Sequence, residues 1–302
     1  MSPILPGANW RALLPGQVAQ LSVADVETGE VRVVHESATL TIEAPNWSPD
    51  GQWLVFNAAG LLYRVPASGG EPEAIDTGHL VDNNNDHVIS PDGRTIYSSA
   101  EIDGHLYAIP FEGGTPVRVS NEWDEPFGYF LQGVSPDGST LSYTGAQRKY
   151  GRDFATNLFT ISAVGGPDVR LTEWDQDSVG CEYSPDGEWL YFNSERGSAT
   201  LGHAQIHRMR LDGTGLQRLT GDERVNWFPK LAPDGRVLVY LSFPPGTIGH
   251  GANVDVVIRR MNLDGSEARD LIQLFGGQGT LNVNSWAPDS RHFAFVQYPV
   301  SP

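Results

Sequence analysis

A short motif that returns six times along the chain limits its fold more than any other feature. Each copy has Ser or Ala, then Pro, then Asp, then Gly or Ser, and the fullest copy reads Trp47-Ser48-Pro49-Asp50-Gly51. The motif aspartates are spaced by 42, 45, 49, 48 and 55 residues, at Asp50, Asp92, Asp137, Asp186, Asp234 and Asp289. Repeats of about this length build propellers from four-stranded blades. The chain is therefore predicted to form a ring of six blades.

Each copy of the motif has the chemistry of a tight turn that leads into a strand. Proline presets φ, the aspartate side chain can accept a hydrogen bond from its own backbone, and glycine adopts the left-handed conformation. Short runs rich in apolar and aromatic residues follow, for example 53–56 and 189–192. A second turn comes later in the repeat, as at Gly69-Gly70. Each repeat is thus expected to hold four antiparallel strands.

The two ends of the chain each carry part of a repeat. Residues 21–34 match the second half of a unit, and residues 286–297 match the first half. Joined, they make a sixth blade from about 18–36 and 284–298, which removes a free sheet edge. The prediction is an all-β, six-bladed β-propeller of four-stranded antiparallel blades, closed by N-terminal strands joining the C-terminal blade. It forms a single domain over 1–302, with 1–17 as an N-terminal extension.

Charge and composition exclude several classes of partner and compartment. The chain has 20 Lys+Arg against 37 Asp+Glu and no basic cluster, so its formal net charge is −17 and nucleic acids are not expected as partners. No membrane span is expected, and residues 1–17 lack the pattern of a signal peptide. We therefore expect a cytoplasmic protein, or a periplasmic one if a leader has been removed. Cys181 is the only cysteine, so no internal disulfide is expected.

The repeated pattern resembles that of the TolB-like six-bladed propellers, from about residue 18 to 298. Trp or Val with Ser-Pro-Asp-Gly, two strands, Gly-Gly and a further strand carry the resemblance. TolB itself has an additional N-terminal α/β domain and works in the periplasm on an outer-membrane lipoprotein. Here six blades use up the sequence and no export signal is visible. The resemblance therefore implies the fold and not the translocation role.

Some TolB-like propellers are oligogalacturonate lyases, which hold a metal through histidines and a glutamine at the mouth of the channel. Gln278 precedes the last inner strand as that glutamine does. Asn282 and Asn284 stand where histidines are expected. The resemblance implies a metal ligand at Gln278 but leaves the lyase activity unsupported.

Two sets of loops are expected to open on one face of the ring, around the mouth of the central channel. One set joins the second and third strands of each blade, and it carries insertions at 145–153, 195–203 and 243–253. These insertions supply Tyr150, Arg152, His203 and His250. The other set leads into the innermost strands and supplies polar and aromatic residues, namely Asn85, Asp86, His87, Asn226, Trp227, Gln278, Asn282 and Asn284.

The first hypothesis for these residues is a site that binds a small polar ligand, such as a carbohydrate, or a loop of a partner protein. Its candidate contacts are Asn85, Asp86, Tyr150, Asn226, Trp227, Gln278, Asn282 and Asn284. Amide and carboxylate groups would hydrogen-bond the ligand, and Trp227 would stack on a sugar ring. Packing between blades also explains a tryptophan at this place.

The second hypothesis is a metal-assisted carbohydrate-active enzyme of the polysaccharide lyase or glycoside hydrolase type. His87, His203 and His250 are its candidate proton acceptors, and Arg152 would neutralise a substrate carboxylate. A divalent cation, manganese or calcium, would be held by His203, His250 and Gln278. A third, structural interpretation is that these side chains only satisfy and pack their own loops.

Overall fold

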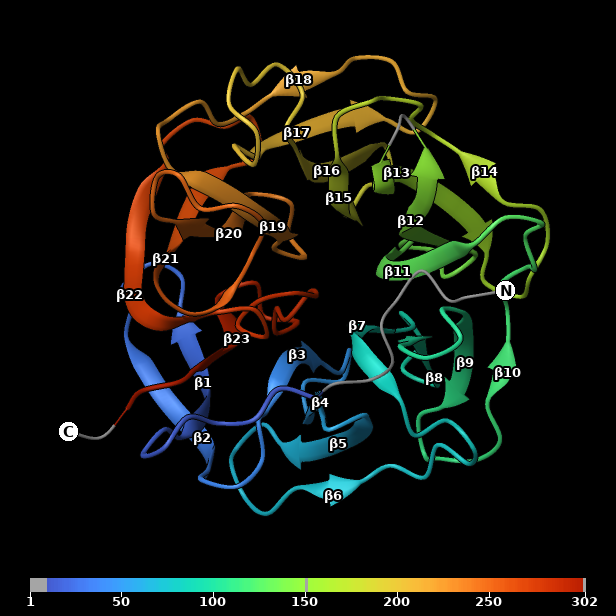
Figure 1. Cartoon of the computed structure of the whole chain (residues 1–302). Helices are drawn as coiled ribbons and strands as arrows, with labels where there is room; N and C mark the ends of the chain where they lie inside the picture. Colours follow the sequence, from blue (N-terminus) through green and yellow to red (C-terminus); the bar gives the residue numbers. More distant parts are fainter. Residues whose placement is uncertain (1–9, 150–151, 301–302) are drawn as a thin grey trace.

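The computed structural model describes residues 10–149 and 152–300, apart from the side chains of Arg152 and Asp153. Six antiparallel sheets surround a central axis, with their innermost strands facing it (Figure 1). We number the blades in the order in which their innermost strands occur. The predicted six-bladed propeller is confirmed.

The first three blades each contain four strands in sequence order. Blade one holds β3 (Glu43–Trp47), β4 (Trp53–Ala58), β5 (Leu61–Pro66) and β6 (Glu73–Ala74). Blade two holds β7 (Asn83–Ile89), β8 (Thr95–Ala100), β9 (Leu106–Pro110) and β10 (Val117–Arg118). Blade three holds β11 (Phe127–Val134), β12 (Thr140–Lys149), β13 (Arg152–Ser162) and β14 (Val169–Arg170).

Blades four and five have the same four-stranded plan. Blade four holds β15 (Ser178–Tyr183), β16 (Trp189–Ser194), β17 (Gln205–Arg210) and β18 (Gln217–Arg218). Blade five holds β19 (Val225–Leu231), β20 (Val237–Phe243), β21 (Ala252–Asn262) and β22 (Arg269–Gly277). Among the described residues no helix is long and apolar enough to span a membrane.

The sixth blade closes the ring with strands from both ends of the chain. β1 (Ala19–Asp25) pairs with β2 (Val31–Ser37) on one side and with β23 (His292–Gln297) on the other. The pairing with β23 runs from Gln20 opposite Gln297 to Asp25 opposite His292, as predicted. The innermost position is reduced to a single bridge between Trp286 and Phe293. The remaining inner segment, residues 278–285, is therefore irregular and supplies loop residues to the channel.

The motif turns have the hydrogen bonds that their sequence predicts. In blades one to four the motif serine hydroxyl lies 2.5–2.6 Å from the aspartate Oδ1 and accepts the backbone N–H that opens the second strand. The glycine N–H donates back to the serine carbonyl. Blades five and six have Ala232 and Ala287 instead and lack the hydroxyl. These two turns keep the backbone hydrogen bond and those that the aspartate side chain accepts from following N–H groups, and lose only the hydroxyl contacts.

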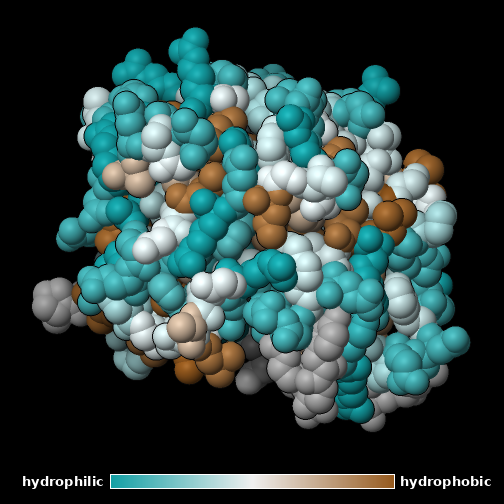
Figure 2. Space-filling model, turned by 90° about the horizontal axis from the view of Figure 1, so that it is seen from above, coloured by the Kyte–Doolittle hydropathy of each residue, from teal (hydrophilic) through white to brown (hydrophobic). Residues whose placement is uncertain are grey.

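The apolar core is divided among the junctions between neighbouring blades. Six clusters of buried residues are present in the described chain, one for each junction. Cys181 lies in the cluster between blades three and four, where burial raises the pKa of its thiol to about 12. On the side of the ring drawn in Figure 2, hydrophobic residues lie in small groups between hydrophilic ones. Blade-to-blade packing therefore supplies the hydrophobic stabilisation.

The three insertions do not all form loops. Residues 195–203 and 243–253 largely connect strands, as expected. The described residues of the third insertion, 145–149 and 152–153, in contrast extend β12 and β13, which remain paired as far as Lys149 opposite Arg152. The prediction of a loop for these residues is wrong, because the antiparallel pairing of β12 with β13 continues into the insertion. This long hairpin raises Phe154 and Thr156 along one side of the channel mouth.

Candidate functional site

A cavity of about 630 Å³ opens at the channel mouth, within the usual size range of small-molecule sites. Every blade contributes to its wall, and the segment before β1 adds Trp10 and Arg11. Several of the predicted site residues meet there: Asn85, Asp86, Trp227, His250, Gln278 and Asn282. Asp86 and Gln278, which are 192 positions apart in the sequence, thus line one cavity because the ring closes.

His250, Gln278 and Asn282 form one polar group of the wall. His250 Nδ1 lies 2.5 Å from Gln278 Oε1, so Nδ1 is the protonated nitrogen and donates to the amide oxygen. Asn282 Nδ2 donates to the same oxygen at 3.3 Å, and Asn282 Oδ1 accepts the Gly279 N–H at 2.9 Å. Burial lowers the pKa of His250, so its ring is neutral near pH 7 and Nε2 carries the lone pair.

Two aromatic rings pack against the His250 ring of this group. The His250 ring centroid lies 4.6 Å from that of Trp227 and 5.1 Å from that of Phe228. Phe228 has φ of 57°, in the left-handed region that a bulky residue rarely adopts. Its backbone N–H is held by the Asn193 side chain at 3.2 Å. Strain of this kind, held in place by a neighbouring blade, is common at ligand sites.

The opposite part of the wall is acidic. Glu43, Asp86 and Glu101 come from blades one and two, and all three line the cavity. Burial raises the pKa of each carboxyl group, and that of Asp86 reaches about 7. The Gln132 amide donates to Asp86 Oδ1 at 2.9 Å and opposes the shift. Mutual repulsion with Glu101 adds to it for both Glu43 and Asp86.

Arg11 is the one positively charged side chain that the described part of the chain places in this wall. Its Nη1 donates to the Gln278 carbonyl at 2.6 Å and lies 3.2 Å from Glu43 Oε1. The guanidinium carbon is 3.9 Å from the centroid of the Tyr298 ring. The segment before the first repeat therefore inserts a cation between a carboxylate, a carbonyl and an aromatic face.

His87 is fully buried and does not line the cavity. The pairing of β7 with β8 is irregular between Asn83 and His87, so Asn84, Asn85 and Asp86 all line the cavity while His87 does not. Within the described chain the His87 ring has no side-chain hydrogen-bond partner, and only backbone groups of Val55 and Asn84 interact with it. Burial lowers its pKa to about 4, so the ring stays neutral. This placement gives His87 a packing role.

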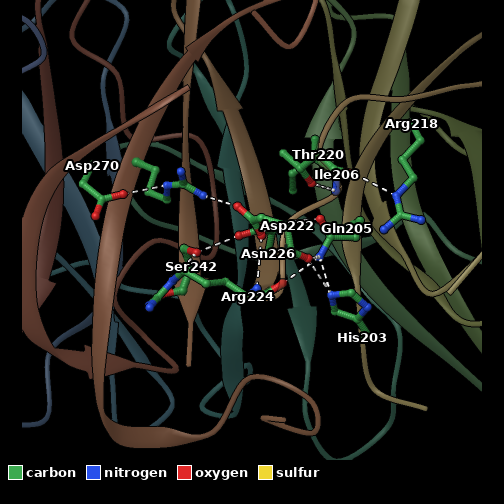
Figure 3. A network of polar contacts seen from close by, with 11 residues as sticks. His203, Gln205, Ile206, Arg218, Thr220, Asp222, Arg224, Asn226, Ser242 and Asp270 are labelled. Atoms are coloured by element: carbon green, nitrogen blue, oxygen red, sulfur yellow. Dashed lines mark hydrogen bonds and ion pairs between the residues drawn. The ribbon is translucent and has the colours of Figure 1, made fainter. Parts of the chain in front are cut away.

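His203 and Asn226 belong to a different polar network, at the junction of blades four and five (Figure 3). His203 Nε2 lies 2.9 Å from the Asp222 carbonyl and 2.9 Å from Gln205 Nε2. Asn226 donates to Asp222 Oδ1 at 3.0 Å and accepts the Ser242 hydroxyl at 2.7 Å. Neither residue lines the cavity. Their contacts tie the two blades together.

Asn284 lies deeper in the channel, in a group that spans blades four to six. Its amide donates to the Glu182 carboxylate and, at 3.3 Å, to the Leu231 carbonyl. Glu182 is in turn 3.2 Å from the buried Lys230 Nζ. Burial raises the pKa of Glu182, and the nearby ammonium opposes this. Tyr150 and the side chain of Arg152 lie outside the described residues.

The structure adds cavity residues that sequence reasoning did not select: Trp10, Arg11, Glu43, Glu101, Phe130 and Phe154. The innermost strands of blades one to five contain register shifts, so alternation did not reveal that Glu43 and Phe130 line the wall. Arg11 precedes the first repeat and has no counterpart in the others. Only the closed ring shows where it lies.

The described residues do not bring the candidate metal ligands together. His250 contacts Gln278, but His203 is held in the network at blades four and five. In residues 10–149 and 152–300 no three His, Cys, Asp or Glu side chains are arranged to hold a metal ion. The donor set found at the channel mouth therefore does not fit the manganese or calcium site considered above.

Comparison with known proteins identifies relatives of the whole chain. An uncharacterized protein of Agrobacterium fabrum is 37% identical over 297 residues, which cover 97% of this chain and 94% of that protein. A structure provisionally described as TolB from Agrobacterium tumefaciens has a TM-score of 0.86 and 36% identity, covering 94% of this chain and 99% of that one.

A more distant fold relative is oligogalacturonate lyase in complex with manganese. It has a TM-score of 0.56 and 16% identity, and the match covers 91% of this chain and 75% of that one. At this identity the likeness shows a shared fold alone. The family model of the TolB beta propeller domain matches residues 133–300. The chain belongs to the TolB β-propeller family.

Proposed function

We propose that this protein is a binding module whose channel-mouth cavity takes a small polar ligand or a polar segment of a partner protein. The observation that carries the proposal is the composition of the cavity wall. Amide, carboxylate and imidazole groups share the wall of this cavity of about 630 Å³ with aromatic rings. Small-molecule sites commonly combine apolar surface with a few polar groups that orient the ligand. The candidate contacts are Asn85, Asp86, Trp227, His250, Gln278 and Asn282.

Unpaired polar atoms in the wall support the same proposal. Gln132 Oε1 and Trp227 Nε1 have no hydrogen-bond partner in the described chain, although both side chains are more than nine-tenths buried. Such atoms are unfavourable unless a water or ligand satisfies them. Neither atom has accessible surface of its own, so a ligand would satisfy them only after a small movement of the wall.

The experiment uses tryptophan fluorescence, because Trp10 and Trp227 line the cavity. The protein is titrated separately with methylguanidinium, galactose and acetate, up to about 10 mM. Gly251→Trp should fill the cavity, since Gly251 lines the wall and a Cβ placed there meets no atom within 4 Å. Gly221→Trp is the matched control on an open surface away from the cavity.

The proposal expects a saturable response to at least one probe, lost in Gly251→Trp and kept in Gly221→Trp. Equal responses of the two variants would place binding elsewhere and overturn it, as would no response to any probe.

An enzymatic role is a second candidate, and His250 is the observation that favours it. Its neutral ring with a lone pair on Nε2 suits a proton acceptor at the cavity. The carboxylates of the wall disfavour an anionic sugar chain as substrate. Turnover of a neutral oligosaccharide, abolished by His250→Ala and kept in His203→Ala, would establish this candidate. Absence of turnover in the unaltered protein would exclude that reaction.

A further inference from the structure

The charged groups of the cavity wall are mostly carboxylates, which favours one class of polar ligand. Its carboxylates are Glu43, Asp86 and Glu101 from blades one and two and Asp177 and Glu195 from blade four, and Arg11 is the one arginine or lysine that the described residues contribute. The aromatic side comes from blades three and five: Phe130, Phe154, Trp227 and Phe228. Carboxylates opposite aromatic faces are the surroundings in which proteins bind organic cations.

The chain already shows how a guanidinium is held there. Arg11 donates to a backbone carbonyl at 2.6 Å, lies 3.2 Å from Glu43 and covers the Tyr298 ring at 3.9 Å. It balances one carboxylate of the acidic side. Asp86 and Glu101 are not among the groups that Arg11 contacts. Gln132 hydrogen-bonds Asp86 through its amide nitrogen, and its Oε1 has no hydrogen-bond partner in the described chain.

Resting on the proposed function, we propose that the cavity binds the cationic group of its ligand, a guanidinium or an ammonium, between Asp86 and Glu101 on one side and the aromatic rings on the other. The cation belongs either to a small molecule or to a lysine or arginine side chain of a partner protein. The protein's net charge of −17 favours the approach of such ligands.

The test compares methylguanidinium with methylurea, a neutral molecule of nearly the same shape, by tryptophan fluorescence and thermal shift at low salt and pH 8, above the pKa of Asp86. Methylguanidinium is expected to bind at least about tenfold more tightly than methylurea, because only the cation gains from the carboxylates. Glu101→Gln should weaken methylguanidinium binding about tenfold or more. Glu223→Gln, which removes one exposed charge away from the cavity, should leave it unchanged.

Arg11→Ala supplies an independent measurement. Removing the resident guanidinium leaves its place beside Glu43 open, so added methylguanidinium should raise the melting temperature of this variant more than that of the unaltered protein. Methylurea should not do so. N-acetylarginine amide distinguishes the sources: tighter binding than methylguanidinium indicates a protein side chain, and equal or weaker binding indicates a small molecule.

Failure of the inference differs from failure of the proposed function. If galactose or acetate binds in a manner that Gly251→Trp abolishes, while methylguanidinium binds no better than methylurea, the cavity is a ligand site but not a cation site. If no probe responds, both proposals fall. Equal weakening by Glu101→Gln and Glu223→Gln would show only general attraction by a negative surface and would overturn the inference.

Discussion

Asp86 is the residue whose environment has the clearest measurable consequence. It sits buried in the cavity wall with a pKa of about 7, against 3.8 as its ordinary value. Between these values the folded protein keeps a proton that the unfolded chain has lost. The free energy of unfolding therefore falls as pH rises from about 4 to about 7. This one group lowers it by at most about 1.4 kcal/mol per pH unit.

Asp86→Asn should remove that fall, because the amide is neutral at every pH and can still accept from Gln132. At pH 8 the variant should be more stable than the unaltered protein by about 2 to 4 kcal/mol, and at pH 4 the difference should vanish. Urea unfolding at pH 4, 6 and 8 measures both. A stability difference that does not change with pH would contradict the assigned pKa.

The repeated turn is the element that sequence reasoning described most completely. Pro, Asp and Gly each act locally, so their positions alone predict the turn, and the hydroxyl contacts of Ser48, Ser90, Ser135 and Ser184 follow the same rule. Strand pairing within a blade is local too. The innermost strands were less predictable, because their register shifts depend on side chains of the preceding blade, such as Asn193 on Phe228.

The turns of blades four and five form a matched pair for measuring the motif. Ser184→Ala deletes the hydroxyl that contacts Asp186 and accepts the Trp189 N–H, and should lower the free energy of unfolding by about 1 to 2 kcal/mol. Ala232→Ser should add the equivalent contacts to Asp234 and Val237 and raise it by up to about 1 kcal/mol. Urea unfolding measures both changes. Destabilisation by Ala232→Ser would show that the fifth turn has a different geometry.

At the scale of the whole molecule, ring closure decides what the site contains. The pairing of β1 with β23 places Arg11, Asp86 and Gln278 around one opening, although they lie far apart in the sequence. The repeat period predicted this ring and the face that carries the loops. It did not separate residues such as His203, which ties two blades, from His250, which lines the cavity. That distinction depends on which direction a loop takes, and no repeat encodes it.

The most direct test of the account is a crystal structure of the protein soaked with the probe that binds most tightly in the fluorescence titration. The account predicts density for that probe at the channel mouth, in contact with Asp86 or Glu101 and against Trp227. Density for the probe at another place, with only water in the cavity, would contradict it.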